Sequence, residues 1–334
     1  MMLPNFPYFD LQKHQSDLPP TGKILVAPLH WGLGHATRCI PIIHQLLEQG
    51  YDPILASDGA ALLLLQKIFP QLKTYELPSY NITYSIKPRF FGLKMVSQLP
   101  HILSNLKREK QLTHKIVKNE NIQAIISDNR FGVFQKDIPS IFITHQLRIK
   151  SGMGSWIATL WHQNIIQKFD FCWVPDVAET PNLSGNLSHD IALKIPIRYI
   201  GMLSQHQPEK LPIQFDLLLL LSGPEPQRSI WEATLIAKYK KSPLRIALVR
   251  GIVSDEKTEI LAVSNWKVYP YLYGKELQDL LNASETVIAR TGYSTLMDLM
   301  VLQKKAILTP TPFQPEQEYL ARHIGNWDDW SMER

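Results

Sequence analysis

The chain has 334 residues, of which 45% are hydrophobic and 19% charged, and its 35 Lys and Arg residues against 30 Asp and Glu residues give a formal net charge of +5. These proportions are typical of a folded globular protein and exclude a disordered or low-complexity chain. The length exceeds what one compact core usually holds, so two domains are expected. Residues 1–22 are polar and punctuated by proline, which predicts a flexible N-terminal arm and not a targeting segment.

Cysteine usage and hydropathy narrow the class further. Cys39 and Cys172 are the two cysteines, and neither belongs to a CxxC motif. This usage favours a reducing cytoplasm and excludes a disulfide scaffold or a structural zinc site. No apolar run approaches the roughly 20 residues of a membrane-spanning helix. Since no nucleic-acid-binding motif accompanies the mild positive charge, an anionic ligand or an anionic membrane surface is the better explanation for it.

The first half of the chain alternates apolar strands with amphipathic helices, which predicts a parallel sheet covered on both faces. The predicted strands are residues 23–29, 53–57, 72–77, 122–127, 140–144, 171–174 and 196–201. The predicted helices are residues 36–49, 60–68 and about 91–119.

The second half repeats this plan after a polar connector at residues 202–212, which predicts a hinge. Its predicted strands are residues 215–221, 245–249, 266–269, 286–289 and 305–308, with helices between them, one at 275–281. We therefore expect an α/β protein with two Rossmann-like, doubly wound parallel-sheet domains, residues 23–201 and 213–334. Ligands of such sheets bind at the carboxyl ends of the strands, so a cleft between the two domains is expected.

A strand, a tight turn and a helix near the end of the chain predict a phosphate site. Gly292 lacks a Cβ atom and tolerates positive φ, so its backbone can approach a ligand closely. A helix N-terminus offers N–H groups without intrahelical partners and a dipole that favours negative charge. Asp298, one to two turns into the helix, lies within reach of ligand hydroxyls. The alternative is an ordinary capped helix in a βαβ unit. The other residues expected to converge there are Thr291, Ser294 and Thr295.

The loop after the first strand carries Gly32, Gly34 and His35. The two glycines predict a tight turn that holds His35 at the start of a helix, where an imidazole can accept a proton near neutral pH. The alternative is a helix-capping loop with a surface histidine. The third glycine of a dinucleotide fingerprint is missing.

Three other loops follow strands and carry polar or aromatic groups. Ser222 and Gly223 are positioned to offer N–H groups to a diphosphate, with Arg228 as counter-charge, although a proline-rich turn with a solvated arginine is the alternative. Arg250 ends the next strand at the same edge. The main chain at Tyr271 and Leu272 is suited to a base edge, unless these tyrosines simply line the core.

Two features of the first half are also candidates. Asp128 follows a strand, and its carboxylate is either a catalytic base or part of an Asx-turn or a helix cap. Residues 87–118 carry seven Lys and Arg residues beyond Lys87 with apolar residues between them. Such a stretch either rests on an anionic leaflet and receives a lipid-linked acceptor, or is a solvated helix face.

The order of these motifs resembles the GT-B glycosyltransferases. The closest type is family 28, which includes the bacterial enzyme that adds N-acetylglucosamine to a lipid-linked peptidoglycan precursor. The resemblance covers roughly residues 23–323 and is most specific over residues 270–321.

This resemblance implies a UDP-sugar donor and assigns roles to the motif residues. Tyr271 and Leu272 would hold the uracil, the turn from Gly292 would cradle the diphosphate, and Asp298 would bind the ribose. Gln317, with Glu316 or Glu318, would grip the sugar. The full donor-binding set is Gly34, Ser222, Gly223, Arg228, Arg250, Tyr271, Leu272, Arg290, Thr291, Gly292, Tyr293, Ser294, Thr295, Asp298, Gln314, Glu316 and Gln317. The acceptor-side set is Trp31, Asn129, His145 and Gln146.

The expected reaction is a single inverting displacement with His35 or Asp128 as the catalytic base. No Asp-x-Asp triplet occurs in the chain, so we expect a metal-independent mechanism with the UDP-sugar as co-substrate and no further cofactor. The acceptor would be a glycan or a lipid-linked acceptor, at the inner face of the membrane or in the cytoplasm, with no nucleic acid involved. A UDP-sugar epimerase or hydrolase and a non-catalytic nucleotide-sugar-binding protein are the alternatives.

Overall fold

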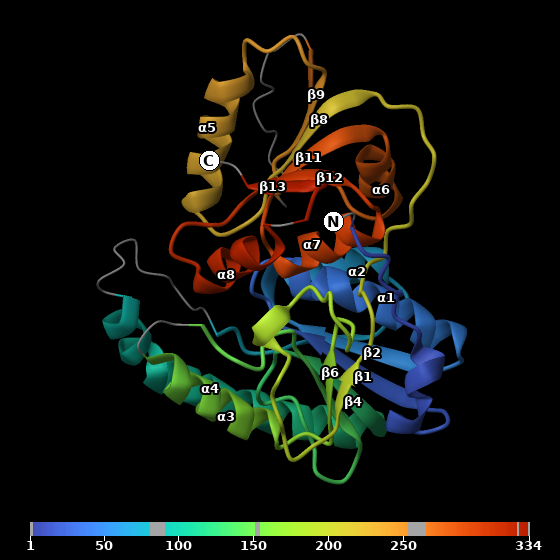
Figure 1. Ribbon diagram of the computed structural model, residues 1–334. Coiled ribbons are helices and arrows are strands. Elements are labelled where there is room, and N and C mark those ends of the chain that lie inside the picture. Colours follow the sequence, from blue (N-terminus) through green and yellow to red (C-terminus); the bar gives the residue numbers. More distant parts are fainter. Residues whose placement is uncertain (1–2, 81–90, 151–153, 253–264, 326, 333–334) are drawn as a thin grey trace. The chain divides into compact units, whose positions relative to one another are not determined.

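A computed structural model describes residues 3–80, 91–150, 154–252, 265–325 and 327–332, with only the helical backbone described over 91–100. The chain forms two compact units (Figure 1). Unit 1 comprises Met1–Tyr8, Glu179–Gly185 and Met202–Arg334, and unit 2 comprises Phe9–Ala178 and Asn186–Gly201. The main change of unit, between Gly201 and Met202, falls at the start of the predicted hinge.

Unit 2 is built on a seven-stranded parallel sheet in the order β3-β2-β1-β4-β5-β6-β7. Its strands are β1 Lys23–Pro28, β2 Asp52–Ser57, β3 Thr74–Glu76, β4 Ile122–Asp128, β5 Ser140–Ile143, β6 Phe171–Val174 and β7 Ile197–Tyr199. Its helices are η1 Leu11–Asp17, α1 Gly34–Glu48, α2 Gly59–Ile68, α3 Phe91–Glu120, α4 Ser155–Ile166 and η4 Gly185–Leu187, the last of which begins in unit 1.

The helices of unit 2 lie on opposite sides of this sheet. From β1 the chain steps through α1 and α2 toward β3, whereas α3 and α4 connect strands in the other direction. Because parallel crossovers are right-handed, the two directions place their helices on opposite faces. Figure 1 shows α1 and α2 on one side of the strands and α3 and α4 on the other. Apolar side chains fill the interface with α3, where Leu25 of β1 and Ile116 of α3 belong to one buried cluster.

Unit 1 has a six-stranded parallel sheet in the order β10-β9-β8-β11-β12-β13. Its strands are β8 Phe215–Leu220, β9 Ile246–Val249, β10 Trp266–Tyr269, β11 Ser284–Arg290, β12 Lys305–Thr309 and β13 Trp330–Met332. Its helices are α5 Gln227–Tyr239, α6 Gly274–Asn282, α7 Tyr293–Val301 and α8 Pro315–Ile324. The expected fold class, two doubly wound parallel sheets, is confirmed. The helices α4 and α8, the strand β13 and the short helices η1 and η4 were not among the predicted elements.

The predicted flexible N-terminal arm is wrong for its described residues. Phe9, Leu11 and Leu18 are buried, and η1 lies on unit 2. Asp17 accepts a hydrogen bond from Trp173 Nε1 at 2.9 Å and pairs with Arg198 at 3.6 Å. The polar sequence hid these contacts because a few apolar residues, spaced among prolines, suffice to anchor a short segment on a core.

The connector at residues 202–212 is also packed, against unit 1. Met202 and Leu203 are buried. The amides of Gln207 and Glu209 donate to side chains of α6, at 2.9 Å to Gln278 and 3.2 Å to Asn282. Unit 1 therefore includes this connector, whereas the sequence predicted that the C-terminal domain would begin at residue 213.

None of the helices in the described parts of the chain combines the length and apolar character needed to cross a bilayer.

Candidate active site

The first group of polar side chains lies at the carboxyl edge of the unit 2 sheet. His35 stands in the first turn of α1, directly after the loop from β1, and Asp128 is the last residue of β4. Pro28 and Asp128 are register partners, so these two chain segments end side by side. The His35 Nδ1 atom lies 2.9 Å from Asp128 Oδ1. The structure thus joins the two residues that the sequence offered as separate candidates for the base.

Arg38, one turn further along α1, completes this cluster. Its Nε donates to Asp128 Oδ2 at 2.5 Å, and its second guanidinium nitrogen donates to Oδ1. Both side chains are almost fully buried. His145, predicted on the acceptor side, has its Nδ1 3.1 Å from Arg38 Nη1 and so adjoins the same cluster.

The electrostatics of this cluster fix the protonation of His35. Burial alone would raise the pKa of Asp128, but Arg38 and His35 outweigh it and hold that pKa well below its usual range. Burial lowers the pKa of His35, against the opposing effect of Asp128. His35 is therefore neutral at pH 7, and its hydrogen bond to the carboxylate keeps the proton on Nδ1. A neutral imidazole held this way presents a basic Nε2 atom.

Asp128 itself is poorly suited to act as the base. Its oxygens already accept from His35 and twice from Arg38, and Cys39 Sγ lies 3.6 Å away. Such a carboxylate orients His35 and keeps its own proton affinity low. Nor does it form the Asx-turn that was the alternative, since its described partners belong to α1 and the neighbouring Asn129 side chain.

The remaining acceptor-side candidates lie on loops at this edge. Asn129 adopts φ of 57° directly after Asp128. Trp31 is 46% exposed on the loop before α1. The Gln146 amide donates to Thr144 Oγ1 at 3.1 Å in the loop after β5.

A second imidazole–carboxylate pair at this edge was missed by the sequence reasoning. His30 Nδ1 lies 3.2 Å from Asp58 Oδ2, and Asp58 accepts from Arg130 at 2.5 Å. Arg130 is also paired with the buried Glu109 of α3 at 3.1 Å. His30 precedes His35 by five residues on the same loop, which was the available signal. The buried Arg130 partner, from the loop after β4, could not be paired with it from spacing alone.

Gly59 makes room for this pair. It has φ of 51°, and a Cβ atom at this position would lie 2.3 Å from the nearest atom of the His30 ring. Asp58 and His30 therefore depend on a glycine that the sequence reasoning did not single out.

The second group lies at the carboxyl edge of the unit 1 sheet, where Gly292 is the N-cap of α7. Its φ of −75° and ψ of 134° are extended, so the positive φ expected there is not used. Only the missing Cβ matters, since an added Cβ would meet no atom nearer than Thr295 Oγ1 at 3.9 Å. No side chain caps the helix, and its first backbone bond runs from Leu296 to Gly292.

Three loops converge at this edge because β8, β11 and β12 are neighbours. The nearest atom to a Cβ built on Gly223, which has φ of 110°, is Thr311 Oγ1 at 3.9 Å. Thr291 Oγ1 donates to the Gln317 carbonyl at 2.9 Å, and Gln317 Oε1 accepts from the Thr311 amide at 2.8 Å. Thr311 is buried, and its hydroxyl has no hydrogen-bond partner in the described structure. The predicted residues Gly223, Thr291, Gly292 and Gln317 are thus brought together around one polar spot.

The arginines expected to face a diphosphate are engaged elsewhere. Glu232 of α5 pairs with Arg228 at 2.7 Å and with Arg250 at 2.5 Å. Arg228 also bonds Glu225, so it is not the solvated arginine of the alternative reading either. Arg290 is buried with its guanidinium 4.1 Å above the Trp231 ring, and it donates to the Pro310 carbonyl. These arginines stabilise the loops and do not present a free charge.

The residues expected at the nucleoside and sugar lie on the same side of unit 1. Asp298 Oδ1 accepts from Ser204 of the connector at 2.5 Å. Burial raises the pKa of Asp298, although His206 and Ser204 oppose the shift. Tyr271 and Leu272, which precede α6, are partly buried, and so is Ser294. Tyr293 is buried, at 3% exposed. Gln314 and Glu316, at the start of α8, are partly buried.

Comparisons with known proteins agree with this architecture. Residues 229–327 match the glycosyltransferase family 28 C-terminal domain. An uncharacterised glycosyltransferase of Methanopyrus kandleri is 20% identical over 294 residues, covering 84% of this chain and 83% of its own. The Geobacillus thermodenitrificans UDP-N-acetylglucosamine--N-acetylmuramyl-(pentapeptide) pyrophosphoryl-undecaprenol N-acetylglucosamine transferase is 22% identical, covering 83% of this chain and 75% of its own.

A solved structure extends the match to the fold. Phytolacca americana UGT2, in complex with UDP-2fluoro-glucose and pterostilbene, superposes with a TM-score of 0.60 at 12% identity, covering 94% of this chain and 86% of its own. This likeness shows the GT-B fold. With the family match and the two glycosyltransferase relatives, it identifies the chain as an enzyme, a glycosyltransferase. More narrowly, the chain resembles the family 28 glycosyltransferases, because residues 229–327, in unit 1, match the C-terminal domain of that family.

Proposed function

We propose that this glycosyltransferase moves a sugar from a UDP-sugar to an acceptor hydroxyl by a metal-independent, inverting displacement. The observation that carries the proposal is the 2.9 Å contact between His35 Nδ1 and Asp128 Oδ1, which leaves the His35 Nε2 atom to act as a base. An acceptor hydroxyl would give its proton to Nε2 as its oxygen attacks the anomeric carbon. UDP would depart from the opposite face of that carbon.

The donor would bind to unit 1. Support comes from the uncapped start of α7 at Gly292 and from the neighbouring Gly223 loop, which together expose main chain at one edge. Negative charge on the departing diphosphate would be stabilised by N–H groups and the helix dipole, each well-aimed donor being worth up to about 4 kcal/mol in the transition state. This stabilisation would replace a metal ion.

Two relatives guide the choice of donor and acceptor. The plant protein was solved with a UDP-sugar analogue, and the name of the Geobacillus relative specifies a lipid-linked acceptor. We infer a UDP-sugar donor and a lipid-linked or cell-envelope acceptor for this chain, used at the inner face of the membrane.

A nucleotide panel tests the donor class. UDP and UDP-sugars should raise the apparent melting temperature of the full chain, since a ligand that binds only the native state stabilises it by mass action. Equal stabilisation by ADP or GDP would contradict the proposal.

Turnover of the stabilising UDP-sugar then separates the alternatives. A transferase releases UDP faster when lipid-linked or envelope glycans are added. A hydrolase releases it at the same rate without them, an epimerase interconverts two UDP-sugars without release, and a binding protein does neither.

A further inference from the structure

His30 lies on the same loop as His35, between β1 and α1, and the proposed reaction makes no use of it. Its Nδ1 atom lies 3.2 Å from Asp58 Oδ2. The imidazole side chain is 30% exposed, whereas the Asp58 side chain is 5% exposed. The aspartate therefore holds the ring from the buried side and leaves part of the ring accessible to a ligand.

A buried network holds Asp58 in turn. Arg130 Nη2 donates to Asp58 Oδ1 at 2.5 Å, and Arg130 Nη1 donates to Glu109 Oε1 at 3.1 Å. Glu109 also accepts from Tyr80 at 2.5 Å and from the Gly132 amide at 2.8 Å. The side chains of Arg130 and Glu109 are fully buried. Burying charges is costly even when they are paired, so a network of this extent behind one loop histidine supports a role for the orientation of its ring.

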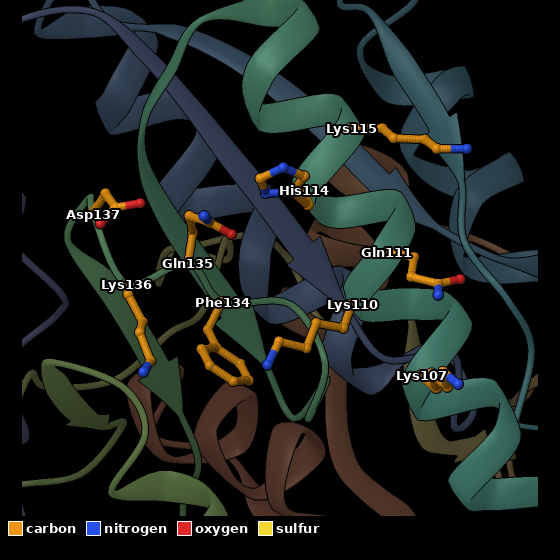
Figure 2. A pocket seen from close by; sticks show the side chains of 9 residues that line it. All are labelled: Lys107, Lys110, Gln111, His114, Lys115, Phe134, Gln135, Lys136 and Asp137. Atoms are coloured by element: carbon orange, nitrogen blue, oxygen red, sulfur yellow. The ribbon is translucent and has the colours of Figure 1, made fainter.

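The lysines of the predicted basic stretch do not neutralise this network. Lys107 and Lys110 flank Glu109 on α3, but both are exposed and line a cavity that Figure 2 shows from close by. Glu109 is buried, so its counter-charge is the buried arginine and not an exposed ammonium group. Residues 87–90 of the basic stretch, and the side chains of residues 91–100, lie outside the described structure.

The charge on Asp58 sets the tautomer of His30. Burial alone would raise the pKa of Asp58, but the hydrogen bond with His30 and the charge of Arg130 outweigh it and lower that pKa. An ionised carboxylate only accepts hydrogen bonds, so the Nδ1 atom that faces it carries a proton. The neutral imidazole then presents Nε2 as an acceptor. Such an atom binds a group that carries a hydrogen, such as a hydroxyl, and not the oxygens of a phosphate or a carboxylate.

The two imidazole–carboxylate pairs lie on either side of β1. Asp58 directly follows β2 and Asp128 ends β4, and these strands are the two neighbours of β1 in the sheet. The Leu29 amide, next to His30, donates to the Asp128 carbonyl at 2.9 Å. Both imidazoles thus belong to the carboxyl edge of the sheet, where ligands of doubly wound folds bind.

We propose that His30 binds the acceptor through a second hydroxyl group, close to the one whose proton His35 accepts. The acceptor is then a glycan or another polyol with at least two hydroxyl groups near each other. One donates to His35 Nε2 and loses its proton as its oxygen attacks, and the other donates to His30 Nε2 and keeps its proton. The second contact orients the acceptor and selects the position that receives the sugar. This inference rests on the proposed function and specifies the acceptor group that unit 2 recognises.

The test is nitrogen-15 NMR of the full chain with the methyl glycosides of glucose, galactose and N-acetylglucosamine and with their monodeoxy derivatives. No donor is added, so no transfer takes place. At alkaline pH the His30 imidazole should give the signals of the Nδ1–H tautomer. Its Nε2 signal should move upfield as at least one glycoside is added, because a hydroxyl donates to that atom. One monodeoxy derivative of this glycoside should leave the His30 signal unmoved and still shift the His35 signal.

Two variants of His30 separate ligand binding from a structural role. His30→Asn keeps a donor for Asp58 near the position of Nδ1 but has no atom at the position of Nε2, so glycoside affinity should fall roughly fivefold. His30→Gln has an amide near the position of Nε2 and should restore the affinity to within about twofold of the wild type. His44→Asn is the matched control with unchanged affinity, because His44 is an exposed histidine of α1. Thermal unfolding confirms that each variant is folded.

Three outcomes would overturn the inference. These are an Nε2–H tautomer at His30, a His30 signal that none of the glycosides shifts, and equal affinity in the wild type and His30→Asn. Failure of the proposed function would look different. If glycans did not accelerate UDP release while a glycoside still shifted the His30 signal, binding at His30 would be supported and transfer refuted. Accelerated release with an unmoved His30 signal would refute this inference alone.

Discussion

The carboxyl edges of the two sheets are built differently, although the sheets share one plan. In unit 2 the edge holds two imidazole–carboxylate pairs, in which His35 and His30 each contact a buried aspartate. In unit 1 the arginines are neutralised by Glu232 and the edge is left to main chain and small side chains around Gly292. The first arrangement suits proton transfer. The second suits binding of an anion by backbone N–H groups, without a charged side chain.

Removing the imidazole should give the largest effect. His35→Ala should lower kcat by roughly 10²–10⁴-fold, the usual contribution of a positioned base, without changing UDP affinity. Initial rates with saturating UDP-sugar, and calorimetry with UDP, measure the two quantities. His44→Ala is the matched control, because His44 is an exposed histidine on the same helix. A rate unchanged in His35→Ala would remove this residue from catalysis.

The pH profile should follow the same imidazole. The pKa of His35 is lowered from the ordinary histidine value of about 6.5, so this imidazole stays neutral at a lower pH than an ordinary histidine does. The acid limb of kcat/KM should therefore fall below pH 6.5, measured from pH 4.5 to 8. A midpoint above 6.5 would contradict the assignment.

The buried carboxylate of Asp128 should contribute more to the free energy of unfolding than an exposed, paired carboxylate of unit 1. Asp128→Asn leaves the buried Arg38 guanidinium without its counter-charge and should cost about 3–5 kcal/mol of unfolding free energy. Asp216→Asn, which breaks an exposed pair with Arg245 in unit 1, should cost at most about 1 kcal/mol. Urea unfolding of both variants measures the contrast, and similar losses would refute it.

The depressed pKa of Asp128 also sets the direction of the pH effect. Its contribution is present above the unfolded value of about 3.9 and is lost as pH falls through the folded pKa. The wild type should therefore lose stability on acidification, and Asp128→Asn should lose less over the same range.

Two glycines extend the contrast to the backbone. Gly59→Ala should destabilise unit 2 by about 1–3 kcal/mol, because a Cβ there combines positive φ with contact with the His30 ring. Chemical denaturation measures this loss, and a change below about 0.5 kcal/mol would show that the ring moves away freely.

Gly292→Ala should leave stability unchanged and weaken ligand binding instead. Its backbone is extended and the added Cβ meets only Thr295 Oγ1, at an ordinary contact distance of 3.9 Å, so the free energy of unfolding should change by less than about 0.5 kcal/mol. UDP affinity should fall about tenfold, or 1.4 kcal/mol, because the methyl group occupies the approach to the helix start. Calorimetry checks the affinity, and an unchanged value would move the diphosphate away from Gly292.

The sequence predicted most of the strands and the motif loops because apolar runs and glycine turns are local signals. It placed β11, α7 and β12 within a few residues of their observed bounds. It missed α4, whose outward apolar side contradicts the usual amphipathic pattern, and it read the packed N-terminal segment as a loose arm.

The candidate site was predicted by residue but not by pairing. His35 and Asp128 were alternatives in the sequence, and 93 positions separate them. The two residues come together only because β1 and β4 are neighbouring strands in the sheet. Likewise, Arg228 and Arg250 look available for phosphate in the sequence, but Glu232, on the same helix as Arg228, pairs with both.

Asp128 also links catalysis to the position of α1, because its two partners, His35 and Arg38, both belong to that helix. The hydrogen bonds of Asp128 with His35 and Arg38 orient the imidazole and also hold the first turns of α1 against the sheet. Anchorage and alignment cannot be tuned separately here. A variant enzyme with a shifted pH optimum is best sought by substituting loop residues near His35, and not by replacing the Asp128 carboxylate that holds α1 in place.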